Sequence, residues 1–137
     1  MPLSDALRSL PYKIHTNSEL GLMLKGIKPL AIFSDGYGAF PECVMRYMRC
    51  FDRCIDDGRL TKREFVVPMS LPHLPHVRGI HRIYYTLPGQ EWRADAMIAL
   101  MEREGAWSAE REREFGTLLG YEDWQNDVWA ERFPYRA

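Results

Sequence analysis

The chain has 137 residues, a hydrophobic fraction of 46%, a charged fraction of 27% and a formal net charge of −1 at pH 7. These values are typical of one folded domain, so we expect residues 1–137 to form a single unit. The charge balance argues against a nucleic-acid-binding protein, because acidic side chains outnumber basic ones after residue 94.

Two further features bear on where the protein works. No apolar run approaches the roughly 20 residues that a membrane-crossing helix needs, and the first ten residues lack the pattern of a secretory signal. The sequence contains 3 cysteines, an odd number without the spacing of a disulfide framework. We therefore expect a soluble cytoplasmic protein with reduced thiols, without a membrane partner.

The first half of the chain predicts a helix, a strand and a second helix. Capping residues precede an apolar segment at 18–26, which indicates a short helix. The apolar run 29–34 between a proline and a glycine-rich segment indicates a buried strand, followed by a tight turn at 35–38. A helix over 41–57 has one apolar face and one charged face, and it should stop at Gly58.

The second half predicts two more strands and a helical end. Strands are expected at 63–69 and 80–87; in the latter, His81, Ile83 and Tyr85 alternate with Arg82 and Tyr84. Helices are expected over 91–104, with a middle that is apolar all round and therefore buried, from Ser108 to Gly120, and over 122–133. The chain should form an α+β fold: a small, mainly antiparallel or mixed sheet of about three strands with helices packed on it.

The first candidate site lies where the first strand, the glycine loop and the 41–57 helix meet. Asp35 can act as a base, and the backbone amides of Gly36 and Gly38, with Tyr37 between them, can approach a ligand closely. The glycine spacing matches neither a phosphate-binding loop nor a dinucleotide-binding fingerprint, and a plain turn explains the same residues.

Thiols and histidines give the second set of candidates. Cys43 falls in the first helical turn, where the helix dipole favours a thiolate, although free cysteines are more often small buried hydrophobic residues. His81 can reach Asp35 as an acid or base if their two strands are neighbours. The cysteines and histidines do not have the spacing of a zinc module, so we expect neither a metal nor a cofactor.

The aromatic residues of the C-terminal tail are the third candidate. Trp124 and Trp129 lie on different faces of the expected last helix, so one small core cannot easily bury both. Either both belong to the core, or one of them meets a ligand or a second subunit.

Three hypotheses for function follow from these observations. We expect first a non-catalytic domain that binds a small molecule or a partner and self-associates, because aromatic residues are plentiful at 12% and no set of catalytic residues converges. The alternatives are a small enzyme that uses Asp35, Cys43 and His81, and a structural subunit with a helical interface.

Overall fold

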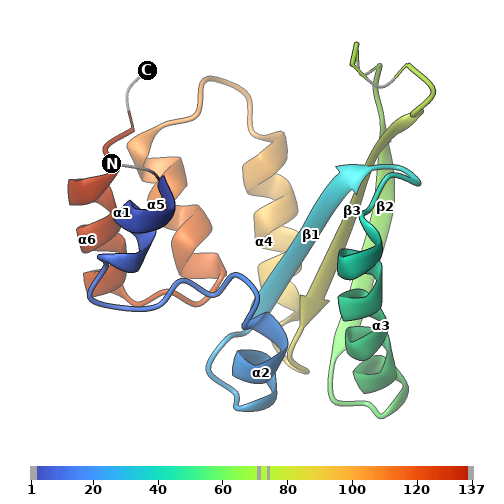
Figure 1. Ribbon diagram of the computed structural model, residues 1–137, viewed down its shortest axis with the longest axis horizontal. Helices are drawn as coiled ribbons and strands as arrows, with labels where there is room; N and C mark the ends of the chain where they lie inside the picture. The colour runs from blue at the N-terminus through green and yellow to red at the C-terminus, as the bar shows by residue number, and fades with distance from the viewer. Residues whose placement is uncertain (1–2, 71, 74, 136–137) are drawn as a thin grey trace.

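The structure is a computed structural model, and it describes residues 3–70, 72–73 and 75–135. Its elements, in chain order, are α1 (Leu3–Arg8), α2 (Glu19–Leu24), β1 (Leu30–Gly36), α3 (Glu42–Asp56), β2 (Thr61–Pro68), β3 (Gly79–Thr86), α4 (Glu91–Glu102), α5 (Ala109–Leu118) and α6 (Asp123–Arg132). The strands form a sheet of order β1-β3-β2 in which both pairs are antiparallel. The predicted α+β fold with a helical C-terminal third is therefore confirmed (Figure 1).

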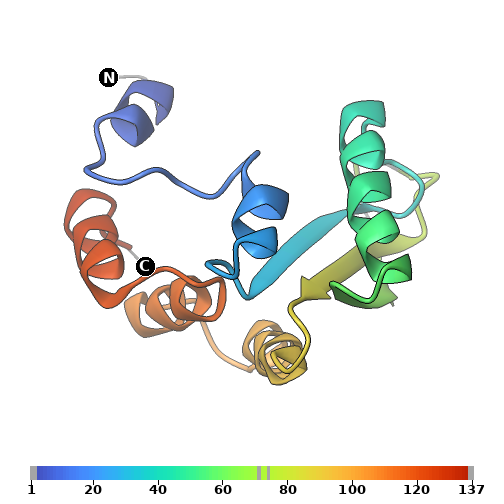
Figure 2. The same ribbon diagram turned by 90° about the horizontal axis from the view of Figure 1, so that it is seen from below.

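The register assigns the side chains of the sheet to two faces. Ala31 pairs with Tyr85, and Phe33 pairs with Ile83, so these four residues share one face. Ile32 pairs with Tyr84 and lies on the opposite face. The alternation predicted for the third strand therefore matches its pairing in the sheet, and helices cover both faces (Figure 2).

Helices α2 and α3 cover the first face. The α3 residues Met48, Phe51 and Cys54 are buried against Ala31, Ile83 and Tyr85 of the sheet, with Met23 of α2 beside them. The ring of Phe51 lies 4.6 Å from that of Tyr85 between centroids. The charged face of α3 stays exposed, as its apolar periodicity predicted.

Helix α4 covers the second face, but it is less buried than the sequence predicted. Ala94, Met97 and Leu100 are buried with Tyr84 and Leu30. Trp92 and Met101, by contrast, are 53% and 38% exposed. The prediction of an all-round buried helix was wrong because α4 packs only its inner face, against β3 and α5, and leaves apolar side chains on the outer face.

Helices α1, α5 and α6 form a separate group beyond the sheet (Figures 1 and 2). The hydroxyl of Tyr12, in the segment after α1, donates to the carbonyl of Gln125 in α6 at 3.1 Å. The Arg132 guanidinium donates to the carbonyl of Ser9 at 2.8 Å. These contacts tie the first described residues of the chain to the last helix.

The predicted helix ends agree with the structure, whereas the predicted turn is shifted. Gly26, Gly58 and Gly120 follow the ends of α2, α3 and α5 and have positive φ, as glycines at helix ends commonly do. Asp35 and Gly36, expected in a turn, belong to β1 because they still pair with β3. Along the described residues, no helix is both long enough and apolar enough to cross a bilayer.

Candidate functional site

A cavity of about 310 Å³ opens between the segment after α1 and helices α5 and α6. We call it the α5–α6 pocket. Its volume lies in the range of sites that hold compact small molecules. It is lined by Leu7, Tyr12, Ile14, Thr16, Glu112, Phe115, Gly116, Leu119, Tyr121, Asn126 and Trp129.

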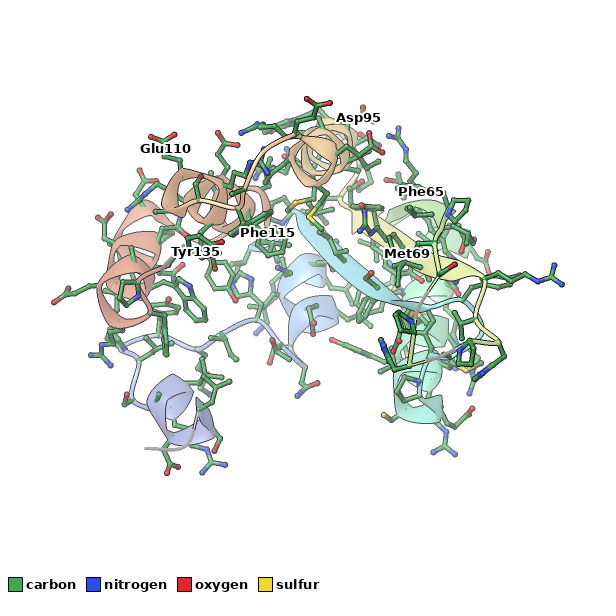
Figure 3. The ribbon with its side chains drawn as sticks, turned by 90° about the horizontal axis from the view of Figure 1, so that it is seen from above. Phe65, Met69, Asp95, Glu110, Phe115 and Tyr135 are labelled. Atoms are coloured by element: carbon green, nitrogen blue, oxygen red, sulfur yellow. The ribbon has the colours of Figure 1, made fainter. Side chains whose placement is uncertain are left out.

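Aromatic and aliphatic side chains make up most of the wall of the pocket. The rings of Tyr12 and Tyr121 meet edge to face, with 6.1 Å between centroids. Phe115 lies on the inner side of α5, whereas Glu110 of the same helix points outward (Figure 3). Trp129 is half-buried, and its ring packs against Phe133 at 4.5 Å. An apolar molecule would therefore find contact on several sides.

Two polar side chains from neighbouring helices complete the wall. The Glu112 carboxylate accepts hydrogen bonds from two indole N–H groups, those of Trp107 at 2.6 Å and Trp129 at 3.3 Å. The buried Asn126 donates through Nδ2 to the Thr117 hydroxyl at 3.1 Å. A mostly apolar pocket with a few fixed polar groups is the usual form of a small-molecule site.

A buried lysine lies next to this pocket. Lys28 is 1% exposed, and its Nζ donates to the carbonyl of Leu119 and lies 2.8 Å from Nδ1 of His15. The His15 ring stacks on the ring of Tyr121 at 3.9 Å, and the His15 backbone N–H donates to the Tyr121 hydroxyl at 2.8 Å. Tyr121 therefore connects the lysine–histidine pair to the pocket wall.

Burial shifts the protonation of both bases in the same direction. It lowers the pKa of His15 to about 4, with the nearby Lys28 charge adding to the effect. It also lowers the pKa of Lys28 to about 7, against the opposing influence of Glu19. The folded protein therefore binds fewer protons at these two groups than the unfolded chain does.

We expect the free energy of unfolding to decrease as the pH is lowered, because of this pair. The sign follows from linkage: stability contributed by His15 is complete above pH 6.5 and is lost as pH falls towards about 4. That of Lys28 is lost as pH falls from 10.5 towards about 7. Urea unfolding of the wild type should therefore show a loss on the order of 2 kcal/mol between pH 6.5 and 4 that is attributable to His15. In His15→Gln that part of the slope should disappear, and an unchanged slope would argue against the assignment.

The structure brings together two of the three predicted catalytic residues. β1 and β3 are neighbours, and Asp35 pairs directly with His81, as the enzyme hypothesis required. Their side chains do not hydrogen-bond to each other: Asp35 Oδ1 accepts from the Gly36 N–H at 2.7 Å, and His81 Nε2 lies 2.8 Å from Glu64 Oε2. Cys43 is exposed in the first turn of α3.

The predicted ligand-binding residues lie at the same end of the sheet. The Tyr37 ring is 54% exposed and lies 5.6 Å from the His81 ring between centroids. Gly38 has positive φ, whereas Gly36 is part of the strand. None of these residues lines the α5–α6 pocket, and their role in binding or catalysis stays a prediction.

The two tail tryptophans have different surroundings. Trp124 is 46% exposed and meets Tyr12 edge to face at 5.5 Å, so a core role for both tryptophans is wrong. Trp129 lines the α5–α6 pocket. The sequence therefore pointed to one pocket residue, but it missed the others, because they come from segments about a hundred residues apart and share no motif.

Cysteines and histidines do not form a metal centre in the part of the chain that the structure describes. Within residues 3–70, 72–73 and 75–135, no three His, Cys, Asp or Glu side chains are placed to hold a metal ion. The three thiols are all free.

Comparison with known proteins finds no family model, curated protein or solved structure that matches this chain. Function therefore has to be inferred from the geometry and chemistry of the site.

Proposed function

We propose that this protein binds a small, largely apolar molecule in the α5–α6 pocket, without chemical conversion. The observation that carries the proposal is the pocket itself: about 310 Å³, walled by Tyr12, Phe115, Tyr121 and Trp129. Such a molecule would contact the N-terminal segment and both C-terminal helices at once. We further propose that the protein acts in the cytoplasm, because its three cysteines are unpaired thiols.

A thermal-shift screen of small aromatic and aliphatic compounds tests the proposal. A ligand that binds only the folded protein raises stability by about 2.7 kcal/mol at a concentration of 100 times its Kd. Thr16→Trp provides the blocked variant, because Thr16 is exposed at the pocket wall and a larger ring there should fill the cavity. We expect hits that stabilise the wild type and the Thr16→Ser control but not Thr16→Trp. Hits that stabilise all three equally would contradict the proposal.

We also propose self-association, through the free edge of β1. The Tyr37 N–H donates to the Gly79 carbonyl, and the Leu87 N–H donates to the Pro29 carbonyl. The backbone N–H and C=O groups of the odd-numbered residues of β1 therefore point towards β3. The backbone groups of Ile32 and Ser34 therefore point away from the sheet, and among the described residues no hydrogen bond occupies them. In Figure 1 no helix crosses in front of the C-terminal half of β1.

The opposite edge of the sheet is protected against pairing. β2 carries Lys62 and Glu64 and ends at Pro68, and charges and proline are the usual means of blocking an edge strand. The middle of β1 has neither. Antiparallel pairing of two β1 edges would satisfy the backbone groups of Ile32 and Ser34 in both copies and would extend the sheet to both subunits.

Replacing Ser34 with proline should convert a dimer to a monomer. The Ser34 N–H faces away from β3, so proline removes no hydrogen bond from the existing sheet but blocks a new strand. Light scattering coupled to size exclusion measures the mass, with Val66→Pro, at the outward-facing position of β2, as the matched control. A wild type that is monomeric throughout, or a dimer that survives Ser34→Pro, would contradict pairing through β1.

A further inference from the structure

The Glu112 carboxylate is the one acidic group among the pocket residues. Its oxygens are held by two neutral donors, the indole N–H groups of Trp107 and Trp129. These bonds fix the orientation of the carboxylate but supply no positive charge. A fixed carboxylate at an apolar wall therefore presents a negative charge to whatever occupies the pocket.

The arginines next to Glu112 on α5 are used elsewhere. The Arg111 guanidinium donates to the backbone carbonyls of Glu104 and Gly105, and the Arg113 guanidinium pairs with Asp127 of α6. In the part of the chain that the structure describes, Glu112 has no lysine, arginine or histidine within ion-pair distance. Among the described residues no cation pairs with this carboxylate, so a cationic ligand could do so.

The aromatic wall suits the same kind of ligand. Phenyl, phenol and indole rings carry negative potential on their faces and attract cations that come within about 6 Å of the ring centre. Tyr12, Phe115, Tyr121 and Trp129 line the pocket together with Glu112. Rings and carboxylate therefore favour the same charge, while the apolar surface of the rings favours a ligand with a hydrocarbon body.

Two nearby positive groups could oppose a cation: Arg132, whose guanidinium acts on Tyr12 but is hydrogen-bonded to Ser9, and Lys28. The Lys28 Nζ lies 5.7 Å from the centre of the Tyr121 ring. The lysine does not line the pocket, however, and its ammonium is committed to the Leu119 carbonyl and to His15, whose ring covers one face of Tyr121. Its pKa of about 7 also means that the positive charge is only partly present at neutral pH.

We propose that the α5–α6 pocket selects small apolar amines, with the ammonium group beside Glu112 and the hydrocarbon body against Tyr12, Phe115, Tyr121 and Trp129. This inference rests on the proposed function of the pocket and names the class of ligand that it takes. Binding requires no conversion of the amine. The ammonium group of the amine pairs with the Glu112 carboxylate and lies against the aromatic rings, and the hydrocarbon body of the amine is removed from water.

Calorimetric titration of the full chain with three matched probes tests the selection. 2-Phenylethylamine, 2-phenylethanol and 3-phenylpropionate share a phenyl body and differ in being cationic, neutral and anionic. We expect the amine to bind about tenfold more tightly than the alcohol, which corresponds to about 1.4 kcal/mol, and the carboxylate to bind most weakly. Raising the salt concentration should narrow the gap between amine and alcohol, because salt screens the charge.

Variants of α5 assign the effect to one carboxylate. In Glu112→Gln the affinity for the amine should fall to that for the alcohol, while the affinity for the alcohol stays the same. Glu110→Gln removes an equal charge from the outer side of the same helix and should leave all three affinities unchanged (Figure 3). If Glu112→Gln does not fold, the salt dependence measured on the wild type still tests whether the charge of the amine is recognised, and a gap between amine and alcohol that salt does not narrow would overturn the inference.

The outcomes separate this inference from the proposed function. If the alcohol binds the wild type as tightly as the amine, and Thr16→Trp abolishes both, the pocket binds small molecules but does not select amines. If none of the three probes binds, the selection of amines is overturned, and the thermal-shift screen with Thr16→Trp decides separately whether the pocket binds other small molecules. A preference for the amine that persists in Glu112→Gln would also overturn the inference, because the charge would then be recognised elsewhere.

Discussion

Replacing Gly79 with alanine should lower the free energy of unfolding by about 3 kcal/mol, near the upper end of what overpacking costs. Gly79 begins β3 and pairs with Pro68 at the end of β2. A methyl group on Gly79 would overlap the carbonyl oxygen of Val67 and lie 3.0 Å from the carbonyl carbon. Both atoms belong to the backbone of β2, so they cannot rotate away as a side chain could. The strands would have to separate at the end where the Gly79 carbonyl also accepts the Tyr37 N–H.

Urea unfolding measures this effect, and Gly21→Ala is the matched control. Gly21 lies inside α2, and a methyl group there has no atom within 4 Å. Alanine favours a helix by about 1 kcal/mol over glycine, so the control should be neutral or slightly more stable. Equal decreases in the free energy of unfolding of the two variants would contradict the close approach of β2 and β3 at Gly79.

Replacing Gly120 with alanine should lower the free energy of unfolding by a similar amount, and it should also weaken binding in the α5–α6 pocket. Gly120 has a φ of +98°, a conformation that costs an L residue about 1–2 kcal/mol. A methyl group there would lie 2.5 Å from Cδ of Pro29, which precedes β1. We expect a total loss of about 3 kcal/mol, because backbone strain and a steric clash add at the same residue. Tyr121 is the next residue, so any ligand of the α5–α6 pocket should bind more weakly.

Gly58→Ala separates the two causes at Gly120. Gly58 has a φ of +74°, but a methyl group there would have open space around it. Its replacement should therefore cost about 1 kcal/mol, from strain alone. Thermal unfolding of both variants, with the Tyr121 resonances followed by NMR, measures stability and local change together. A Gly120→Ala protein no less stable than Gly58→Ala would contradict the contact with Pro29.

Much of the fold could be predicted because its signals are local. The apolar stripe of α3 and the alternation in β3 each follow from a few neighbouring residues, and the ends of helices follow from single glycines. Helix α1 gave no such signal. It has six residues and none is buried, and its position depends on contacts such as Arg132 with Ser9, which lie 123 residues apart.

The candidate site was harder to predict for the same reason. The sequence indicated Trp129, together with Trp124, as a tryptophan that one small core cannot easily bury, and Trp129 lines the pocket. His15 and Lys28 did not stand out, because a lone histidine and a lone lysine are ordinary surface residues. Lys28 stands directly before the apolar run Pro29–Leu30–Ala31, but lysines are almost never fully buried, so nothing in the sequence predicted its burial. Their pairing depends on the approach of α5 to these segments, which no periodicity encodes.

The most direct test of the central proposal is an NMR titration that follows the four tryptophan indole N–H signals while 2-phenylethylamine is added. Trp129 lines the α5–α6 pocket, whereas Trp92 is exposed on α4 and serves as the internal reference. If the pocket is a binding site, the Trp129 signal should shift and saturate while the Trp92 signal stays in place. A Trp129 signal that does not move, or one that drifts in parallel with Trp92 without saturation, would contradict binding in this pocket.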